Sequence, residues 1–196
     1  MYSIGEKGMS DAVCDALVLF LQGLQFKSFD ETGMNSKPFS FSNVWREWPS
    51  PGVSLQYPTA VVLPVPEEYE PSSLTPFVME ETYNPADGSV LVKPSEFVAQ
   101  LPITIWTLNA KQRDAVMEGL EYAFNPNLDQ YGVFLTLPGK FSTTARFAML
   151  GNKKLDTQDN TFRGELQNTV IVKCWADYVY KTYIPLIVPS LIYTIT

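Results

Sequence analysis

Residues 97–126 read FVAQLPITIWTLNAKQRDAVMEGLEYAFNP, and two hydrophobic periods meet inside this stretch. Its first half places apolar residues at every second position, namely Leu101, Ile103 and Ile105. This alternation predicts a strand with one face in a core. Its second half places apolar residues at helical spacing, namely Val116, Met117, Leu120, Ala123 and Phe124. A period of about 3.6 predicts an amphipathic helix, so we expect a strand that runs directly into a helix packed on the sheet.

Short signals mark the ends of this β-α unit. Asn109 stands at the N-cap position, where its side-chain oxygen can accept a backbone N–H of the first turn, and Gln112 can reach back. Asn125-Pro126 ends the helix, because the residue before a proline avoids helical backbone angles. Pro102 donates no backbone hydrogen bond, so we expect the strand to begin at an edge or to have one side at an edge.

The remaining segments predict an α/β (α+β) fold with a mixed, mostly antiparallel sheet flanked by two helices. We expect residues 1–196 to form one domain. Ser10 is placed to cap the first helix, 11–24, whose two apolar faces predict cover by the sheet and by another element or subunit.

Residues 26–57 look irregular, and residues 156–160 have the composition of a turn. Strand patterns occupy 58–66, 77–83, 89–93, 131–137, 145–155 and 161–183, with Gly164 as a candidate bend in the last.

A long excursion, 64–96, separates two of these strands. It opens with the acidic residues Glu67, Glu68 and Glu70, which predict a solvated loop, and continues as a hairpin with its turn at 84–88. Excursions of this length are uncommon without a role in binding or assembly. We expect it to project from the core. The interface residues predicted here are Glu67, Glu68, Glu70 and Phe77.

The segment 183–196 is a second candidate interface. It is uncharged and rich in apolar side chains, and Pro185 and Pro189 oppose a helix. A segment of this composition would be an aggregation hazard if it were free. We expect an extended C-terminal arm that docks on an adjacent subunit or another partner, with docking on its own subunit as the alternative. The predicted contact residues are Ile184, Leu186, Ile187, Leu191, Ile192 and Tyr193.

Composition excludes several kinds of chemistry. The chain has no histidine, which excludes Ser-His and Cys-His nucleophiles and His-bearing zinc sites, and it has no GxxxxGK[ST] or GxGxxG motif. Cys14 and Cys174 are interpreted as buried apolar side chains. We expect no enzyme activity and no catalytic, cofactor-binding or metal-binding residues. A formal charge of −7 disfavours tight binding to a phosphate backbone, and no apolar run reaches the about 20 residues of a membrane span.

The order of elements is helix, strand, long hairpin excursion, strand, helix and then three strands. Together with the segments ITIWTLN and RDAVMEGLEYAF, this order resembles tail terminator and related neck proteins of long-tailed bacteriophages. The resemblance covers residues 10–180 at the level of element order. It implies a homohexameric ring that caps the tail tube, joins it to the head connector and lets DNA pass without specific binding. It also implies a place in the virion tail or neck, after assembly in the host cytoplasm.

Two classes of function stay open. Ring assembly accounts for a helix that is apolar on two faces, aromatic residues in loops and an uncharged terminal arm. The alternative is a small-ligand or peptide-binding α/β domain, or an enzyme without histidine, in which the loop aromatics line a pocket. The oligomeric state in solution distinguishes a closed ring from a compact monomer.

Overall fold

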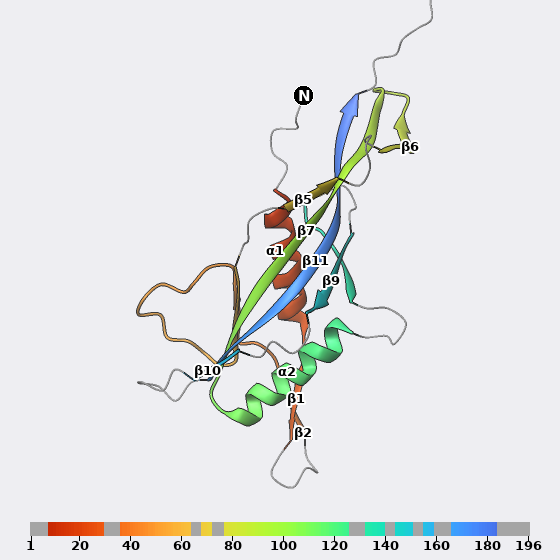
Figure 1. Ribbon diagram of the computed structural model, residues 1–196. Helices are drawn as coiled ribbons and strands as arrows, with labels where there is room; N and C mark the ends of the chain where they lie inside the picture. Colours follow the sequence, from red (N-terminus) through yellow and green to blue (C-terminus); the bar gives the residue numbers. More distant parts are fainter. Residues whose placement is uncertain are drawn as a thin grey trace, which may run out of the picture.

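The computed structural model describes residues 8–29, 36–63, 68–71, 77–125, 132–139, 144–150, 155–158 and 166–183 (Figure 1). Two helices, a nine-stranded sheet and a separate two-stranded hairpin lie in these residues. The elements are α1 (Met9–Gly23), β1 (Phe26–Phe29), β2 (Ser36–Phe39), β3 (Asn43–Trp45), β4 (Thr59–Val62), β5 (Glu68–Pro71), β6 (Phe77–Asn84), β7 (Ser89–Thr107), α2 (Ala110–Phe124), β8 (Val133–Thr136), β9 (Thr144–Met149), β10 (Leu155–Gln158) and β11 (Leu166–Tyr183). This arrangement confirms the predicted α+β fold.

Two long strands, β7 and β11, form the centre of the sheet. They pair antiparallel from Thr107 opposite Leu166 to Ser89 opposite Tyr183. Figure 1 shows them side by side along most of the length of the molecule. The main strand order is β3-β4-β7-β11-β9-β8, with β5 and β6 also paired to β7 and β10 paired to β11. Of the strand pairs described, β3–β4 is parallel and the others are antiparallel, so the sheet is mixed and mostly antiparallel as predicted.

β7 is one continuous strand where the sequence predicted two, at 89–93 and 97–108. Ser95 and Glu96 lie between those ranges, and both pair with residues of β11. The local sequence around Pro94 carries no alternating pattern. Pairing with a second long strand therefore supplies the extended structure that the local pattern does not.

The strand β4, within the predicted range 58–66, is second from one edge of the sheet, and all four of its residues are buried. It pairs with β7 at 103–106, whereas β5 pairs with β7 at 95–98. Within the described residues, 99–102 therefore have no partner strand on this side of β7. Pro102 lies in this gap, where its missing N–H breaks no hydrogen bond to β4 or β5.

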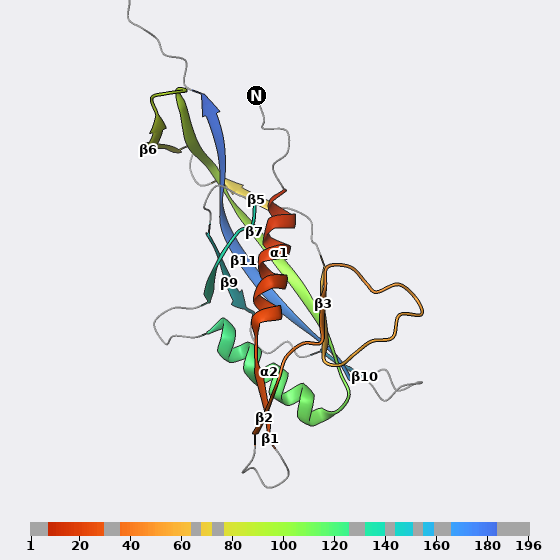
Figure 2. The same ribbon diagram turned by 180° about the vertical axis from the view of Figure 1, so that it is seen from behind.

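Both helices pack on one face of the sheet and enclose a hydrophobic core. α1 lies behind β7 and β11 in Figure 1 and in front of them in Figure 2. α2 meets the end of α1, where the ring centroids of Phe20 and Phe124 are 5.3 Å apart. Fully buried side chains from both helices and from three strands fill this core: Leu17, Leu21, Leu101, Ile103, Leu120, Phe124, Phe147 and Val172.

The helix α1 begins earlier than predicted. It starts at Met9 with Gly8 at the N-cap, so Ser10 lies inside the first turn and the predicted Ser10 cap is wrong. Met9 is only 2% exposed and belongs to the core, and its burial favours inclusion in the helix. On the other side of α1, Leu19 is 60% exposed. Cover of this second apolar face by a neighbouring subunit stays a prediction.

The helix α2 has the predicted start and end. The Asn109 side chain accepts a hydrogen bond from the Gln112 backbone N–H at 2.9 Å. The Gln112 side chain in turn accepts from the Leu108 backbone N–H, also at 2.9 Å, so it reaches one residue beyond the cap. The helix ends at Phe124, before Asn125. The predicted apolar face is confirmed as the buried face, with Val116, Met117, Leu120 and Phe124 in the core.

Residues 26–57 are less irregular than the sequence predicted, because they contain β1, β2 and β3. The Phe26 ring centroid lies 5.5 Å from that of Phe39 and 5.0 Å from that of Phe41. These phenylalanines pack on one another and on the core of the chain. They are therefore covered without a second copy of the chain, and their presence does not favour assembly.

The C-terminal half contains one strand that the sequence did not predict. β8 and β9 lie within or close to their predicted ranges, but residues 156–158, predicted as a turn, belong to β10 and pair with β11. Asp and Asn favour turns locally, whereas the long β11 offers a pairing partner that local composition cannot reveal. Gly164, the candidate bend, lies outside the described residues. The described irregularity in β11 falls between Tyr178 and Tyr180.

Leu120→Ala tests the packing of α2. Leu120 is fully buried in the core, so we expect the truncation to lower the free energy of unfolding by about 2–5 kcal/mol, the usual range for a large-to-small core change. Denaturant titration followed by circular dichroism measures this loss. A loss below about 0.5 kcal/mol would place Leu120 outside the core, contrary to the structure.

Gly119→Ala tests the contact between α2 and β1. A Cβ atom at Gly119 would lie 2.5 Å from Cδ1 of Phe26, whose ring is buried. Overpacking costs about 1–3 kcal/mol and the gain in helix propensity is about 1 kcal/mol, so we expect a net loss of about 1 kcal/mol. Gly23→Ala is the matched control, because a Cβ there meets nothing within 4 Å. If Gly119→Ala were as stable as this control, the contact would not constrain α2.

Candidate assembly surfaces

A projecting ribbon extends from the body of the molecule. It consists of β6, the first residues of β7 and the last residues of β11, and Figure 1 shows it beyond the ends of the helices. Val90 and Val92 are 1% and 5% exposed, yet they lie outside the core cluster. Near the base of the ribbon, Nζ of Lys93 lies 2.6 Å from a carboxylate oxygen of Asp177. The ribbon is therefore a continuation of the β7–β11 pairing of the body, and its buried valines lie outside the helix-covered core cluster.

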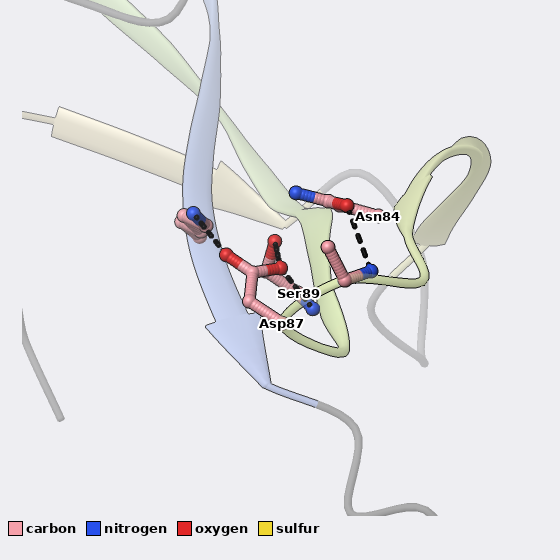
Figure 3. A network of polar contacts seen from close by, with 5 residues as sticks. Asn84, Asp87 and Ser89 are labelled. Carbon is pink, nitrogen blue, oxygen red and sulfur yellow. Dashed lines mark hydrogen bonds and ion pairs between the residues drawn. The ribbon is translucent and has the colours of Figure 1, made fainter.

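Polar contacts fix the turn between β6 and β7 at the tip of this ribbon (Figure 3). Gly88 N–H donates to the Asn84 carbonyl at 2.9 Å, and Gly88 has the positive φ of 68° that glycine adopts readily. The Asp87 carboxylate accepts from the backbone N–H of Ser89 at 3.0 Å and from its hydroxyl at 2.5 Å. Nζ of Lys181 on β11 donates to the other Asp87 oxygen at 3.2 Å. The turn is thus tied to both long strands.

These contacts change the acidity of Asp87. The Ser89 hydroxyl is the largest cause, followed by the Ser89 backbone N–H, and together with Lys181 they lower the Asp87 pKa from 3.8 to about 2. Hydrogen bonds to a carboxylate favour its charged form. The turn therefore carries an ionised carboxylate well into the acidic range.

Some of the predicted interface residues lie in the described strands, and the others lie outside the described residues. Glu68 and Glu70 lie in β5, so the predicted loop at this acidic run is wrong, because these residues pair with Val98 and Glu96 of β7. Phe77 is the first residue of β6 and pairs with Lys93. The remaining predicted residues lie outside the described ranges: Glu67, Ile184, Leu186, Ile187, Leu191, Ile192 and Tyr193.

The second face of the sheet carries no helix among the described residues, and we call it the helix-free face. Its positions alternate with the core positions along each strand. Trp106 on β7 lies on this face, and its ring centroid is 5.3 Å from that of Trp48, which is 52% exposed. Phe134 on the edge strand β8 is 58% exposed. An aromatic surface of this kind is typical of a binding or assembly face.

A basic and aromatic cluster lies on the helix-free face, on the side of the sheet formed by β11, β9 and β8. Trp175, Arg146 and Phe134 form one row across β11, β9 and β8, because Trp175 pairs with Arg146 and Arg146 pairs with Phe134. The Arg146 guanidinium carbon lies 4.4 Å from the Trp175 ring centroid, and Nζ of Lys173 lies 4.8 Å from it. We call Arg146, Lys173 and Trp175 the cation cluster.

Sequence reasoning did not select the residues of the helix-free face. The alternation in 101–106 already separates Trp106 from the core positions, and the same period in β11 separates Trp175 from Cys174 and Ala176. The signal available was the occurrence of tryptophan at non-core strand positions. The contact between Arg146 and Trp175 could not be predicted from the alternating period, because it depends on the pairing of β9 with β11.

The described residues contain no group of three or more His, Cys, Asp and Glu side chains that could hold a metal ion. Cys14 on α1 and Cys174 on β11 are both buried and free, as their interpretation as apolar side chains requires. Burial raises the pKa of the Cys14 thiol to about 11 and also raises that of Cys174. Both groups are therefore protonated at neutral pH and are poor nucleophiles.

Ser89→Ala tests the Asp87 network. Loss of the hydroxyl should raise the Asp87 pKa from about 2 towards 3.8, which carboxyl-carbon NMR titration measures directly. Because the folded-state pKa is the lower one, the network stabilises the fold above about pH 4, and this contribution is lost as the pH falls towards 2. Asn84→Ala is the matched control: it removes the Asn84–Ala86 hydrogen bond of the same turn and should leave the Asp87 pKa unchanged. An unchanged Asp87 pKa in Ser89→Ala would contradict the network.

Neither protein-family models nor curated protein sequences give a match to this chain. No helix in the described ranges is both long and apolar enough to cross a membrane. The chain's function is therefore inferred from its own residues and their arrangement.

Proposed function

We propose that the chain is a structural component of a bacteriophage virion, a ring-forming tail terminator or neck protein that joins the tail tube to the head connector. The observation that carries the proposal is the projecting ribbon, whose strands extend beyond the helix-covered core. A free-standing subunit needs no such extension, whereas a ribbon of this kind can contact an adjacent copy. The order of helices and strands, which resembles these proteins, supplies the specific class.

Exposed apolar residues on different surfaces of the subunit support assembly into a ring. Leu19 on α1 is 60% exposed and Tyr122 on α2 is 75% exposed, while Phe134 is 58% exposed on the helix-free face. Contact between two different surfaces of identical subunits is heterologous, and such contacts close into rings when the rotation between neighbours permits it. We propose a homohexamer because the resemblance implies that number.

The proposed role requires DNA to pass through the ring without being held. A formal charge of −7 opposes tight binding of a phosphate backbone, because the gain from counterion release needs clustered cations. A ring of six such subunits is strongly acidic as a whole. This charge favours passage of DNA over its retention. We propose that the ring acts through its contacts with the tail tube and connector, without cofactors.

A ligand-binding domain is the competing proposal. In this alternative the loop aromatics line a pocket, but Phe41 is buried in the core of the chain and Phe39 packs against that core. Trp48 and Trp106 are the aromatic pair that still suits this alternative, because Trp48 is half exposed. A compact monomer in solution would favour ligand binding over the ring.

Removal of the C-terminal arm tests ring formation. We expect the full chain to form a closed ring in sedimentation velocity and negative-stain images. Truncation after Tyr183 keeps β11 complete and removes residues 184–196, so it should give monomers with a nearly native far-UV circular dichroism spectrum. A truncated chain that still forms the full ring would show that the arm serves its own subunit or a different partner. A full chain that stays monomeric would refute the ring.

A further inference from the structure

Arg146 and Lys173 are two cations without a carboxylate partner among the described residues. Both approach the ring of Trp175, and neither takes part in the ion pairs that Lys93, Lys181, Arg46 and Arg113 form. Each cation is attracted to the negative face of the indole ring, but the ring carries no net charge, so the cluster keeps its positive charge. In a chain of formal charge −7, such a cluster is suited to receive carboxylates from outside the subunit.

The outer face of α2 carries exposed negative charges, opposite in sign to the cation cluster. Glu118 and Glu121 are exposed, and neither has an ion-pair partner in the part of the chain that the structure describes. Side chains three residues apart on a helix lie on the same side, about 5–6 Å apart at Cβ. Tyr122, which is 75% exposed, lies beside them and follows Glu118 by one helical turn. We call Glu118, Glu121 and Tyr122 the acidic stripe.

We propose that the acidic stripe of one copy docks on the cation cluster of a neighbouring copy. Each surface has two charges of one sign that are unpaired within the described ranges, beside an exposed aromatic side chain, Tyr122 on the helix and Phe134 on the sheet. Association would place Glu118 and Glu121 against Arg146 and Lys173, and it would cover both rings. The occupant of the helix-free face is thus α2 of a second copy.

This arrangement gives the sheet a helix on its second face. Within one subunit both helices cover the core face, so the neighbour's α2 completes a helix-sheet-helix sandwich across the contact. The two docking surfaces are different parts of the chain, and the contact is therefore heterologous, as a ring requires. The inference rests on the proposed ring and names the surfaces that would form it.

Two charge-reversal variants test the contact. The sheet variant carries Arg146→Glu and Lys173→Glu, and the helix variant carries Glu118→Lys and Glu121→Lys. In either variant alone, every contact brings like charges together, so we expect association to weaken by roughly a hundredfold or more in sedimentation experiments. In an equimolar mixture, the reversed helix of one variant meets the reversed sheet of the other, and the unreversed surfaces also match. The mixture should therefore associate with an affinity close to that of the original chain.

Lys27→Glu with Lys37→Glu is the matched control. Both lysines are exposed on the β1–β2 hairpin, and this pair changes the net charge by the same amount as the sheet variant. We expect the control to associate normally. Far-UV circular dichroism of each variant checks its fold. If a reversal unfolds the chain, the neutral variant Arg146→Gln with Lys173→Gln replaces it, and its association should lose most of its salt dependence.

The outcomes separate this contact from the ring itself. Rescue in the mixture, with normal association of the control, supports docking of α2 on the helix-free face. Association of the original chain that survives both reversals, or a mixture that stays dissociated, overturns this contact and leaves the ring to other surfaces. An original chain that remains monomeric up to millimolar concentration overturns both the contact and the ring.

Discussion

The antiparallel pairing of β7 with β11 is the constraint on which the rest of the structure depends. It runs from Leu166 opposite Thr107 at one end to Tyr183 opposite Ser89 at the other. β4, β5 and β6 attach to β7, whereas β9 and β10 attach to β11. The same ladder passes through the helix-covered body and continues into the projecting ribbon. Body and ribbon are therefore parts of one hydrogen-bonded unit, and the position of the ribbon is set by the core.

The sequence was sufficient to predict the parts of the fold that depend on local periodicity. The change of period between Ile105 and Val116 predicted the β-α unit, and Asn109 with Gln112 predicted the start of α2. The predictions failed where pairing between distant segments decides the structure. β5 was predicted as a loop and 156–158 as a turn, because acidic and turn-forming residues dominate there, and each is a strand paired with a long partner.

The candidate surfaces were predictable to a smaller extent. The turn at 84–88 followed from its composition, but the tie from Asp87 to Lys181 depends on β11 lying beside the hairpin. The cation cluster combines residues from β9 and β11, which are neighbours in the sheet and far apart in the sequence. Amphipathic periods identify the side of a strand that faces the core. These periods do not identify which residues of two paired strands lie side by side. Binding surfaces are built from such cross-strand neighbours.

The burial of the two cysteines has a practical consequence for studying the molecule. The thiolate is the reactive form of cysteine, and burial keeps both Cys14 and Cys174 protonated at neutral pH. The chain contains no other cysteine. A single cysteine introduced at an exposed position, such as Ala86 in the ribbon turn, would therefore be the preferred target of a thiol-specific dye or spin label. Labels at chosen points of the ribbon could then measure whether copies of the chain associate as proposed, without first removing the native cysteines from the core.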